Sequence, residues 1–293
     1  MKLIVSDLDG TLLNSKHEIS KENVKALRTA KENGYEVAIA TGRIYTDVLN
    51  ILKKADIEAH IISGNGSTVH TIEGKKIKSW SIPKDELKAA IHWLIDNNFF
   101  LQLLTDKNVY LHYDFENTIK EDYKLAKSNN PKITKEYIDI TMNLIFSQYG
   151  IKYFNDIDEL LDSDLEFCCI SSMSFDENKL NYGREYVKNF KGLSSVISHK
   201  YNFELVSKDA SKGNALEYLA KHLNISLNDV IAFGDNFNDV SMFKKAGISV
   251  AMGNAENEIK RMCRFVTLTN NEDGVANFIY KHLETTNAES TPA

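Results

Sequence analysis

Short apolar runs alternate with amphipathic stretches in the first third of this 293-residue chain. Runs at 3–6, 36–41 and 60–63 have the length and composition of buried strands, and the stretches between them space apolar residues along one helical face. Ser20 is a good helix N-cap, and Gly34 is a good helix stop. Strands that alternate with helices predict an α/β fold, in which a doubly wound, Rossmann-like parallel sheet is covered on both faces.

The alternation stops near residue 80 and resumes after residue 207. Residues 81–207 hold amphipathic stretches, alternating apolar runs and connectors rich in lysine and asparagine, but no motif with an obvious chemistry. We therefore expect a discontinuous core domain, 1–80 and 208–293, with an inserted α+β domain at 81–207. The final residues, 285–293, are expected to form a frayed tail.

Composition limits the partners that this chain can have. Its net charge of −6 argues against nucleic acid, because phosphate backbones are bound by basic surfaces. Its three cysteines are too few for a disulfide framework or a zinc site and suit core positions in a reducing compartment. No apolar run approaches the roughly 20 residues of a membrane span, and no signal peptide is apparent. We expect a cytoplasmic protein without a membrane partner, either a monomer or a weak homo-oligomer.

Two aspartates, Asp7 and Asp9, directly follow the first apolar run. Residues two apart in an extended segment share a face, so these carboxylates would repel each other unless a cation lies between them or one is protonated. A calcium loop of the EF-hand type would need its glycine at the sixth position, whereas Gly10 comes fourth here. A further acid, Asp235, ends a later apolar run. Together the acids predict an oxygen-rich site suited to Mg²⁺.

Polar residues also follow the second and third apolar runs. Ligands of open parallel sheets bind beyond the carboxyl ends of the strands, which is where Thr41, Gly42 and Arg43 are expected, as is the turn at 64–66. A hydroxyl group beside a glycine N–H at a helix start can hold a phosphate, although this is also an ordinary strand-to-helix turn. Arg43 either contacts a substrate phosphate or pairs with a nearby acid.

Later in the chain, Lys212 stands between a serine and a glycine at the start of a predicted helix. A cation is not favoured there by the helix dipole, so an anionic partner is indicated, although most lysines are simply solvated. Asn238 and Asp239 follow Asp235 closely. They are candidates for the same rim of the sheet, but they are also common turn and cap residues.

Four motifs resemble those of the haloacid dehalogenase-like hydrolase superfamily, and most closely its Cof-type sugar-phosphatase branch. They are DLDGTLL (7–13), ATGR (40–43), SKG (211–213) and GDNFNDVSM (234–242). The motifs come in the family's order and surround an insertion of the family's cap type. The resemblance implies a Mg²⁺-dependent phosphatase that hydrolyses small phosphate monoesters, such as sugar phosphates, through an aspartyl-phosphate intermediate.

The resemblance also implies a role for each motif residue. Asp7 would be the nucleophile, and Asp9 would be the general acid and then the general base. Mg²⁺ would be held by the side chains of Asp7 and Asp235 and by the main-chain carbonyl of Asp9. The transferring phosphoryl group would be bound by Thr41, the Gly42 amide, Lys212 and Asn238, with Asp239 orienting Lys212.

The substrate is the point at which the sequence leaves alternatives open. Sugar phosphates, nucleotides and phosphorylated cofactors all fit a phosphatase of this kind, since the cap would contact the leaving group. Two other functional classes stay open. One is a phosphotransferase such as a phosphomutase, and the other is a non-catalytic sensor of phosphorylated metabolites. The aromatic residues Trp80, Trp93 and Tyr113 are expected in the core of the cap rather than at a ligand.

Overall fold

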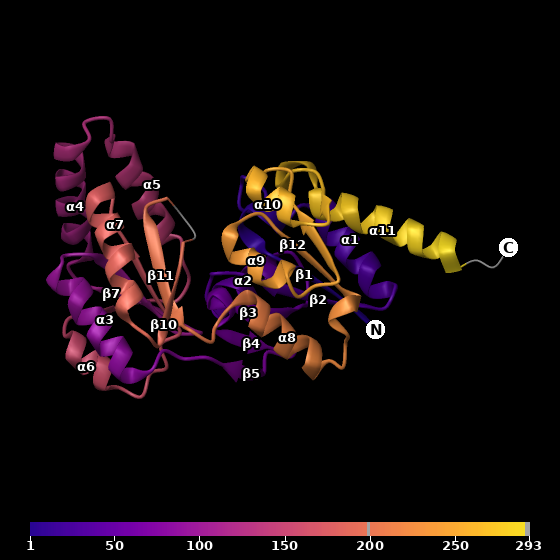
Figure 1. The fold of residues 1–293 in the computed structure, drawn as a ribbon, viewed down its shortest axis with the longest axis horizontal. Helices are drawn as coiled ribbons and strands as arrows, with labels where there is room; N and C mark the ends of the chain where they lie inside the picture. Colours follow the sequence, from indigo (N-terminus) through magenta and orange to yellow (C-terminus); the bar gives the residue numbers. More distant parts are fainter. Residues whose placement is uncertain (198–199, 291–293) are drawn as a thin grey trace. The chain divides into compact units, whose positions relative to one another are not determined.

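The computed structural model describes residues 1–197 and 200–290 and divides the chain into two compact units. The first unit comprises Met1–Gly42, Val48–Lys78 and Ser211–Ala293, and the second comprises Arg43–Asp47 and Ser79–Ala210. Each unit contains its own β-sheet (Figure 1). The structure divides the chain after residues 78 and 210, whereas the sequence analysis expects the divisions after residues 80 and 207. The grouping of 43–47 with the second unit has no counterpart in the sequence pattern.

The first unit is built on an eight-stranded sheet with the order β14-β13-β12-β1-β2-β3-β4-β5. The strands from β14 to β3 run parallel, and β4 is antiparallel to β3. Successive strands extend from β1 to one side and from β12 to the other, so the predicted doubly wound α/β fold is confirmed. The bounds are β1 Lys2–Ser6, β2 Tyr35–Ala40, β3 His60–Ser63, β4 Thr68–His70, β5 Lys76–Ser79, β12 Val230–Gly234, β13 Ile248–Ala251 and β14 Phe265–Val266.

Helices accompany this sheet as the sequence predicts. The Ser20 side chain accepts a hydrogen bond from the Asn23 N–H and caps α1, which ends just before Gly34 at a φ of 81°. Helix α1 packs beside α11, and α8 packs beside α9, with strands β12, β1 and β2 between α9 and the α1–α11 pair (Figure 1). The bounds are α1 Lys21–Glu32, α2 Tyr45–Lys54, α8 Lys212–His222, α9 Val240–Phe243, α10 Asn257–Met262 and α11 Gly274–Ser290.

The C-terminal helix corrects one expectation. Helix α11 continues to Ser290, so residues 285–290 are helical and not frayed; residues 291–293 lie outside the described residues. Ile279 and Leu283 bury their side chains and anchor the helix. No glycine or proline follows Gly274 until Pro292, so nothing in the sequence breaks the helix earlier.

The second unit has a six-stranded sheet with the order β10-β11-β9-β6-β7-β8, antiparallel except for the β7–β8 pair. Its strands are β6 Phe100–Leu104, β7 Val109–His112, β8 Ile151–Phe154, β9 Cys169–Met173, β10 Leu193–Val196 and β11 Asn202–Ser207. Its helices are α3 Lys84–Asp96, α4 Phe115–Asn129, α5 Lys135–Phe146, α6 Ile157–Asp162 and α7 Glu177–Tyr186. Short helical turns complete the two units: η1 Leu8–Leu12, η2 Gly64–Gly66, η3 Val187–Asn189, η4 Leu227–Asp229, η5 Phe237–Asp239 and η6 Asn270–Glu272.

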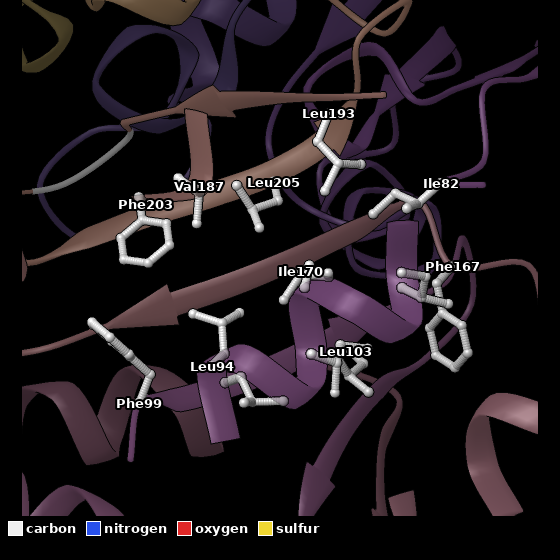
Figure 2. Packing of buried hydrophobic residues seen from close by; sticks show 14 of the residues in the cluster. Ile82, Leu94, Phe99, Leu103, Phe167, Ile170, Val187, Leu193, Phe203 and Leu205 are labelled. Atoms are coloured by element: carbon white, nitrogen blue, oxygen red, sulfur yellow. The ribbon is translucent and has the colours of Figure 1, made fainter. Parts of the chain in front are cut away.

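Apolar side chains pack on both faces of this second sheet. Strand β6 is buried throughout, because its side chains alternate between two clusters. Leu101 and Leu103 join the cluster that includes Leu94 of α3 (Figure 2), and Phe100 and Leu104 join the cluster that includes Phe115 of α4. The second unit therefore has a hydrophobic core of its own, as a separate domain requires.

The aromatic residues of the second unit behave as expected with one exception. Trp93 packs against the first of these clusters and stacks on Tyr186, and Trp80 packs against the second. Tyr113 was expected in the core but is 65% exposed. It lies just after the end of β7, where the strand's alternation between faces no longer directs a side chain inward. None of the described helices is long and apolar enough to cross a membrane.

Candidate active site

Two carboxylates lie at the point where the strand order of the first sheet reverses. Asp7 follows β1 and Asp235 follows β12, and these strands are neighbours, with the Asp7 N–H donating to the carbonyl of Phe233 at 2.9 Å. Gly10 lets the turn after Asp7 lie against Asp235, because a Cβ there would come within 2.4 Å of Asp235 Oδ2. A reversal of strand order is where open α/β sheets bind their ligands.

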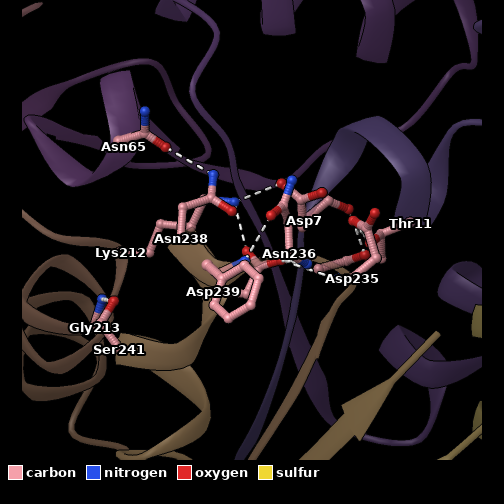
Figure 3. A network of polar contacts seen from close by, with 12 residues as sticks. Asp7, Thr11, Asn65, Lys212, Gly213, Asp235, Asn236, Asn238, Asp239 and Ser241 are labelled. Atoms are coloured by element: carbon pink, nitrogen blue, oxygen red, sulfur yellow. Dashed lines mark hydrogen bonds and ion pairs between the residues drawn. The ribbon is translucent and has the colours of Figure 1, made fainter. Parts of the chain in front are cut away.

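Lys212 links this pair to a third carboxylate. Its Nζ donates to Oδ1 of Asp7 and to Oδ1 of Asp239, both at 2.6 Å, and its side chain is fully buried (Figure 3). Ser211 caps helix α8 by accepting from the Asn214 N–H, which fixes Lys212 in the first turn. Burial opposes its charge, but Asp239 and Asp7 outweigh that effect and raise the pKa of Lys212.

Both carboxylate oxygens of Asp239 accept hydrogen bonds. Its Oδ1 accepts from Lys212, and its Oδ2 accepts from the backbone N–H groups of Asp235 and Asn236, both at 3.0 Å. A Cβ on Gly234 would come within 2.4 Å of this Oδ2, so glycine is needed beside it. Asp239 thus holds both Lys212 and the loop that carries Asp235.

The other two acids are less satisfied. Oδ1 of Asp7 accepts from Lys212, but no described residue donates to its Oδ2. Thr11 Oγ1 donates to Oδ1 of Asp235 at 3.0 Å. Burial and the neighbouring carboxylates raise the pKa of Asp7 well above its ordinary value, despite Lys212. Burial, followed by Asp239, raises the pKa of Asp235 to about 6.

The charges of this cluster fit a divalent cation. Oxygen atoms of Asp7, Asp235 and Asp239 lie within 4.8 Å of one another. Three carboxylates and the ammonium of Lys212 sum to −2 when all are ionised, in a buried place where excess charge is unfavourable. An all-oxygen donor set is what Mg²⁺ prefers. Because Asp239 is already occupied, Asp7 and Asp235 are the side chains with oxygen atoms to offer.

The loop after β2 lies beside these acids along the sheet, since β2 pairs with β1. Thr41 is buried, and its N–H donates to the Ile62 carbonyl at 2.9 Å. Gly42 follows it, and a Cβ at Gly42 would come within 3.2 Å of the side-chain nitrogen of Asn65. The structure therefore brings Thr41 and Gly42 to the same rim of the sheet as Asp7.

Asn238 contacts Asn65, a residue to which the sequence analysis assigned no role. Its Nδ2 donates to Oδ1 of Asn65 at 3.0 Å (Figure 3). Asn65 is 2% exposed, with a φ of 55°. The signal for it was the sequence Gly-Asn-Gly directly after the third apolar run, where a polar side chain that tolerates positive φ stands between two glycines.

Asp9 and Arg43 are not part of the buried cluster formed by Asp7, Lys212 and Asp239. Asp9 is exposed in turn η1, close enough to Asp235 to help raise that residue's pKa. Arg43 belongs to the second unit, where its Nη1 donates to Oδ2 of Asp47 at 2.8 Å. This ion pair is one of the two alternatives that the sequence left open for Arg43.

Nearly the whole chain matches a known protein family, and the matched region includes the four motifs. The sequence profile of the haloacid dehalogenase-like hydrolases covers residues 4–279. The chain belongs to this family. The membership predicted from the motifs is thereby confirmed.

Curated relatives in the haloacid dehalogenase-like family are phosphatases. The chain is 40% identical to phosphatase YwpJ of Bacillus subtilis, over 97% of this chain and 100% of that one. It is 36% identical to the 5-amino-6-(5-phospho-D-ribitylamino)uracil phosphatase YwtE of the same organism, over 95% and 97%. A solved haloacid dehalogenase-like hydrolase from B. subtilis superimposes with a TM-score of 0.83 at 39% identity, over 96% of this chain and 99% of that one. The protein is a phosphatase, a phosphoric monoester hydrolase of this family.

Proposed function

We propose that this phosphatase is Mg²⁺-dependent and hydrolyses sugar phosphates or similar small phosphate monoesters through an aspartyl phosphate on Asp7. The observation that carries the proposal is the position of Asp7. Its carboxylate lies at the end of β1, 2.6 Å from the buried ammonium of Lys212, with its Oδ2 accepting no hydrogen bond from the described residues. A fixed carboxylate oxygen beside a cation is suited to attack on phosphorus.

Two charges keep Asp7 available as a nucleophile despite its burial. Lys212 lowers the pKa of Asp7 against the opposing effect of desolvation. Mg²⁺, held by the side chains of Asp7 and Asp235 and the main-chain carbonyl of Asp9, would supply the remaining positive charge that a phosphate dianion needs near these acids. Asp239 keeps Lys212 in position through its own ion pair.

Asp9 would act as the general acid in the formation of the aspartyl phosphate and as the general base in its hydrolysis. In the first, Asp7 Oδ2 forms a bond to phosphorus, the bond to the leaving oxygen breaks, and Asp9 gives its proton to that oxygen. In the second, Asp9 takes a proton from the water that attacks the phosphorus of the aspartyl phosphate, which releases inorganic phosphate and restores Asp7. An exposed carboxyl group can exchange its proton with solvent between these steps.

Four groups would hold the phosphoryl oxygens during both steps. They are the Thr41 hydroxyl group, the Gly42 N–H, the Lys212 ammonium and the Asn238 side chain, on the loops after β2 and β12 and at the start of α8. Fixed donors of this kind contribute most of the catalysis in phosphoryl transfer, because the transferring group spreads its charge over its oxygens.

The leaving group would be recognised by the second unit acting as a cap, with Arg43 on the same unit as a candidate contact. One relative is named for a substrate whose phosphate is on a ribityl chain, which is a sugar alcohol. This favours phosphate esters of sugars and related polyols. The net charge of −6 argues against nucleic acid, so we propose that the enzyme acts on free metabolites. We place it in the cytoplasm, as a monomer or weak homo-oligomer.

A panel of phosphorylated metabolites tests the proposal. Phosphate release is measured with Mg²⁺ for sugar phosphates, polyol phosphates, nucleotides and 5-amino-6-(5-phospho-D-ribitylamino)uracil, with the Asp7→Asn protein as control. We expect turnover on sugar and polyol phosphates. Phosphate appearing on an added acceptor instead of in solution would make the protein a phosphotransferase. Binding without turnover would make it a sensor.

A further inference from the structure

Asn65 connects the loops of the site but has no part in the chemistry proposed above. It is the middle residue of turn η2, which follows β3. Its backbone is in the left-handed region, at φ 55° and ψ 31°, and its side chain is almost completely buried. Buried polar side chains are retained where they have hydrogen-bond partners, so the contacts of Asn65 indicate its role.

Those contacts lead to two of the loops assigned to phosphate. The Asn65 N–H donates to the carbonyl of Thr41 at 2.9 Å, which ties the turn to the loop after β2. Its carboxamide lies against Gly42, as the 3.2 Å approach of a Cβ there indicates. Its Oδ1 accepts from Nδ2 of Asn238 at 3.0 Å, and the two side chains point toward each other in Figure 3.

The same turn also contacts the start of helix α8. Gly66 has a φ of 97°, and a Cβ there would come within 2.1 Å of the Ser211 carbonyl oxygen. The turn therefore packs directly against the residue before Lys212. All three elements that would carry phosphate-binding groups meet at η2, and Asn65 is the residue of η2 that hydrogen-bonds two of them.

The amide of Asn238 has two possible orientations, and Asn65 selects one of them. Phosphoryl oxygens accept hydrogen bonds, so Asn238 can serve them only through Nδ2. With Nδ2 donating one hydrogen to Asn65, its second hydrogen remains for a ligand, while its Oδ1 is buried and accepts from no described residue. With Asn65 oriented as it is, a flipped Asn238 amide would bring two carbonyl oxygens together and would present an acceptor to the anion.

We propose that Asn65 is a positioning residue for phosphate binding. Its Oδ1 holds the Asn238 amide so that the second Nδ2 hydrogen is directed to the transferring phosphoryl group, and its carboxamide packs against Gly42 and keeps that N–H in place. The inference rests on the proposed function in one respect, the assignment of Asn238 and Gly42 to the phosphate.

The Asn65→Gly protein isolates the side chain. Glycine adopts positive φ without strain, so the backbone of the turn is preserved. Asn224→Gly is the matched control, because Asn224 also has a positive φ, of 57°, but is exposed at the end of α8. Asn238→Ala and the Asn65→Gly/Asn238→Ala double variant complete a cycle that measures the coupling of the two residues.

Three measurements are made on each protein: calorimetric titration with inorganic phosphate in Mg²⁺, steady-state hydrolysis of one good substrate, and the melting temperature. We expect Asn65→Gly to raise both the phosphate Kd and KM by about 10-fold, near the low end for a hydrogen bond to a charged group. It should also lower kcat, because the same donors hold the transferring phosphoryl group. Asn224→Gly should match the wild type. In the Asn238→Ala background, Asn65→Gly should weaken phosphate binding less than it does in the wild type, because only its support of Gly42 remains to be lost.

Three results would overturn the inference. The first is an unchanged phosphate Kd in Asn65→Gly, and the second is additive effects of the two substitutions. The third is a lower melting temperature and kcat with Kd and KM unchanged, because that result indicates a structural role alone. If the wild type binds phosphate but hydrolyses no monoester, the proposed function fails and the titration still decides the role of Asn65. If the wild type binds no phosphate, both proposals fail.

Discussion

The ammonium of Lys212 lies 2.6 Å from Oδ1 of Asp239, and neither side chain is exposed to solvent. Asp239 also accepts the N–H groups of Asp235 and Asn236, so one carboxylate joins the start of α8 to the loop after β12. These two segments are separated by a whole helix and strand in the sequence. Their connection by a buried ion pair means that the stability of the first unit and the geometry of its site depend on the same residue.

The Asp239→Asn substitution should therefore affect both properties. The new carboxamide could still accept from Lys212 through its one oxygen, but its Nδ2 cannot accept from the two backbone N–H groups. Loss of one partner of a buried ion pair destabilises proteins by about 3–5 kcal/mol, and we expect a loss of that order in calorimetric unfolding, together with weaker substrate binding. Asp56→Asn is the control: its exposed pair with Arg28 should contribute less than about 1 kcal/mol. Equal effects of the two substitutions would contradict this interpretation.

The two aspartates of the first motif should fail in different ways. Asp7→Asn removes the nucleophile, so no phosphoenzyme should form and turnover should vanish. Asp9→Asn removes proton transfer, typically worth about 10²–10⁴ in rate, so an activated aryl phosphate should still phosphorylate Asp7 and the intermediate should then persist. Mass spectrometry should find one added phosphoryl group on the peptide that contains Asp7. A label on another peptide would refute these roles.

Metal dependence should be measurable in the absence of turnover. Mg²⁺ should raise the melting temperature of the wild type, because it binds the folded carboxylates and not the unfolded chain, and excess chelator should abolish both this shift and the activity. Ca²⁺ should support little activity, since its looser and larger coordination suits this site poorly. Asp235→Asn should remove most of the Mg²⁺ shift, whereas the exposed Asp56→Asn should not. Full activity in chelator would rule out the metal.

The junction between the two units should be the preferred site of proteolysis. Lys208 is exposed in the turn that precedes the 210/211 border, so limited trypsin treatment should cut after it early. Lys179 is a matched internal site: its ammonium pairs with the buried Asp122 at 2.8 Å, and it should resist. Mass spectrometry of the first fragments checks this order. Early cutting at Lys179 instead would argue against a compact second unit.

His60, which is not among the residues of the candidate site, should make the free energy of unfolding depend on pH. Burial lowers the pKa of His60 below its ordinary value, although Glu36, 3.4 Å away, opposes the shift. The folded protein therefore binds fewer protons than the unfolded chain, and stability should fall as pH drops through the unfolded value of about 6.5. The fall in melting temperature between about pH 7 and 5 should be shallower in His60→Gln.

Exposed His17 provides the control for this measurement. Its φ of 57° is tolerated by asparagine, so His17→Asn should follow the wild-type pH dependence. A His60→Gln protein whose stability falls as steeply as the wild type would show that other groups carry the effect.

The sequence by itself determined the elements and the order of the chemical groups. Runs of apolar residues fixed β1, β2, β3 and β12, because a strand that is buried on both faces must be apolar throughout. Since the strands are parallel, residues at their carboxyl ends gather at one rim whatever the details of packing. The sequence alone therefore predicts that Asp7, Thr41 and Asp235 lie together.

Side-chain partnerships across loops were decided only by the tertiary structure. The 2.6 Å contacts of Lys212 depend on the close approach of α8 to α9, which Gly213 permits, and on the position of Asp239 against Gly234. No sequence periodicity encodes either approach. The burial of Asn65 against Asn238 depends in the same way on the approach of two turns 173 residues apart. The polar composition of residues 285–290 suggested a frayed tail, but helix α11, in which Ile279 and Leu283 are buried, continues to Ser290. Local sequence sets the elements, while hydrogen bonds between distant loops form only where packing brings their atoms within reach.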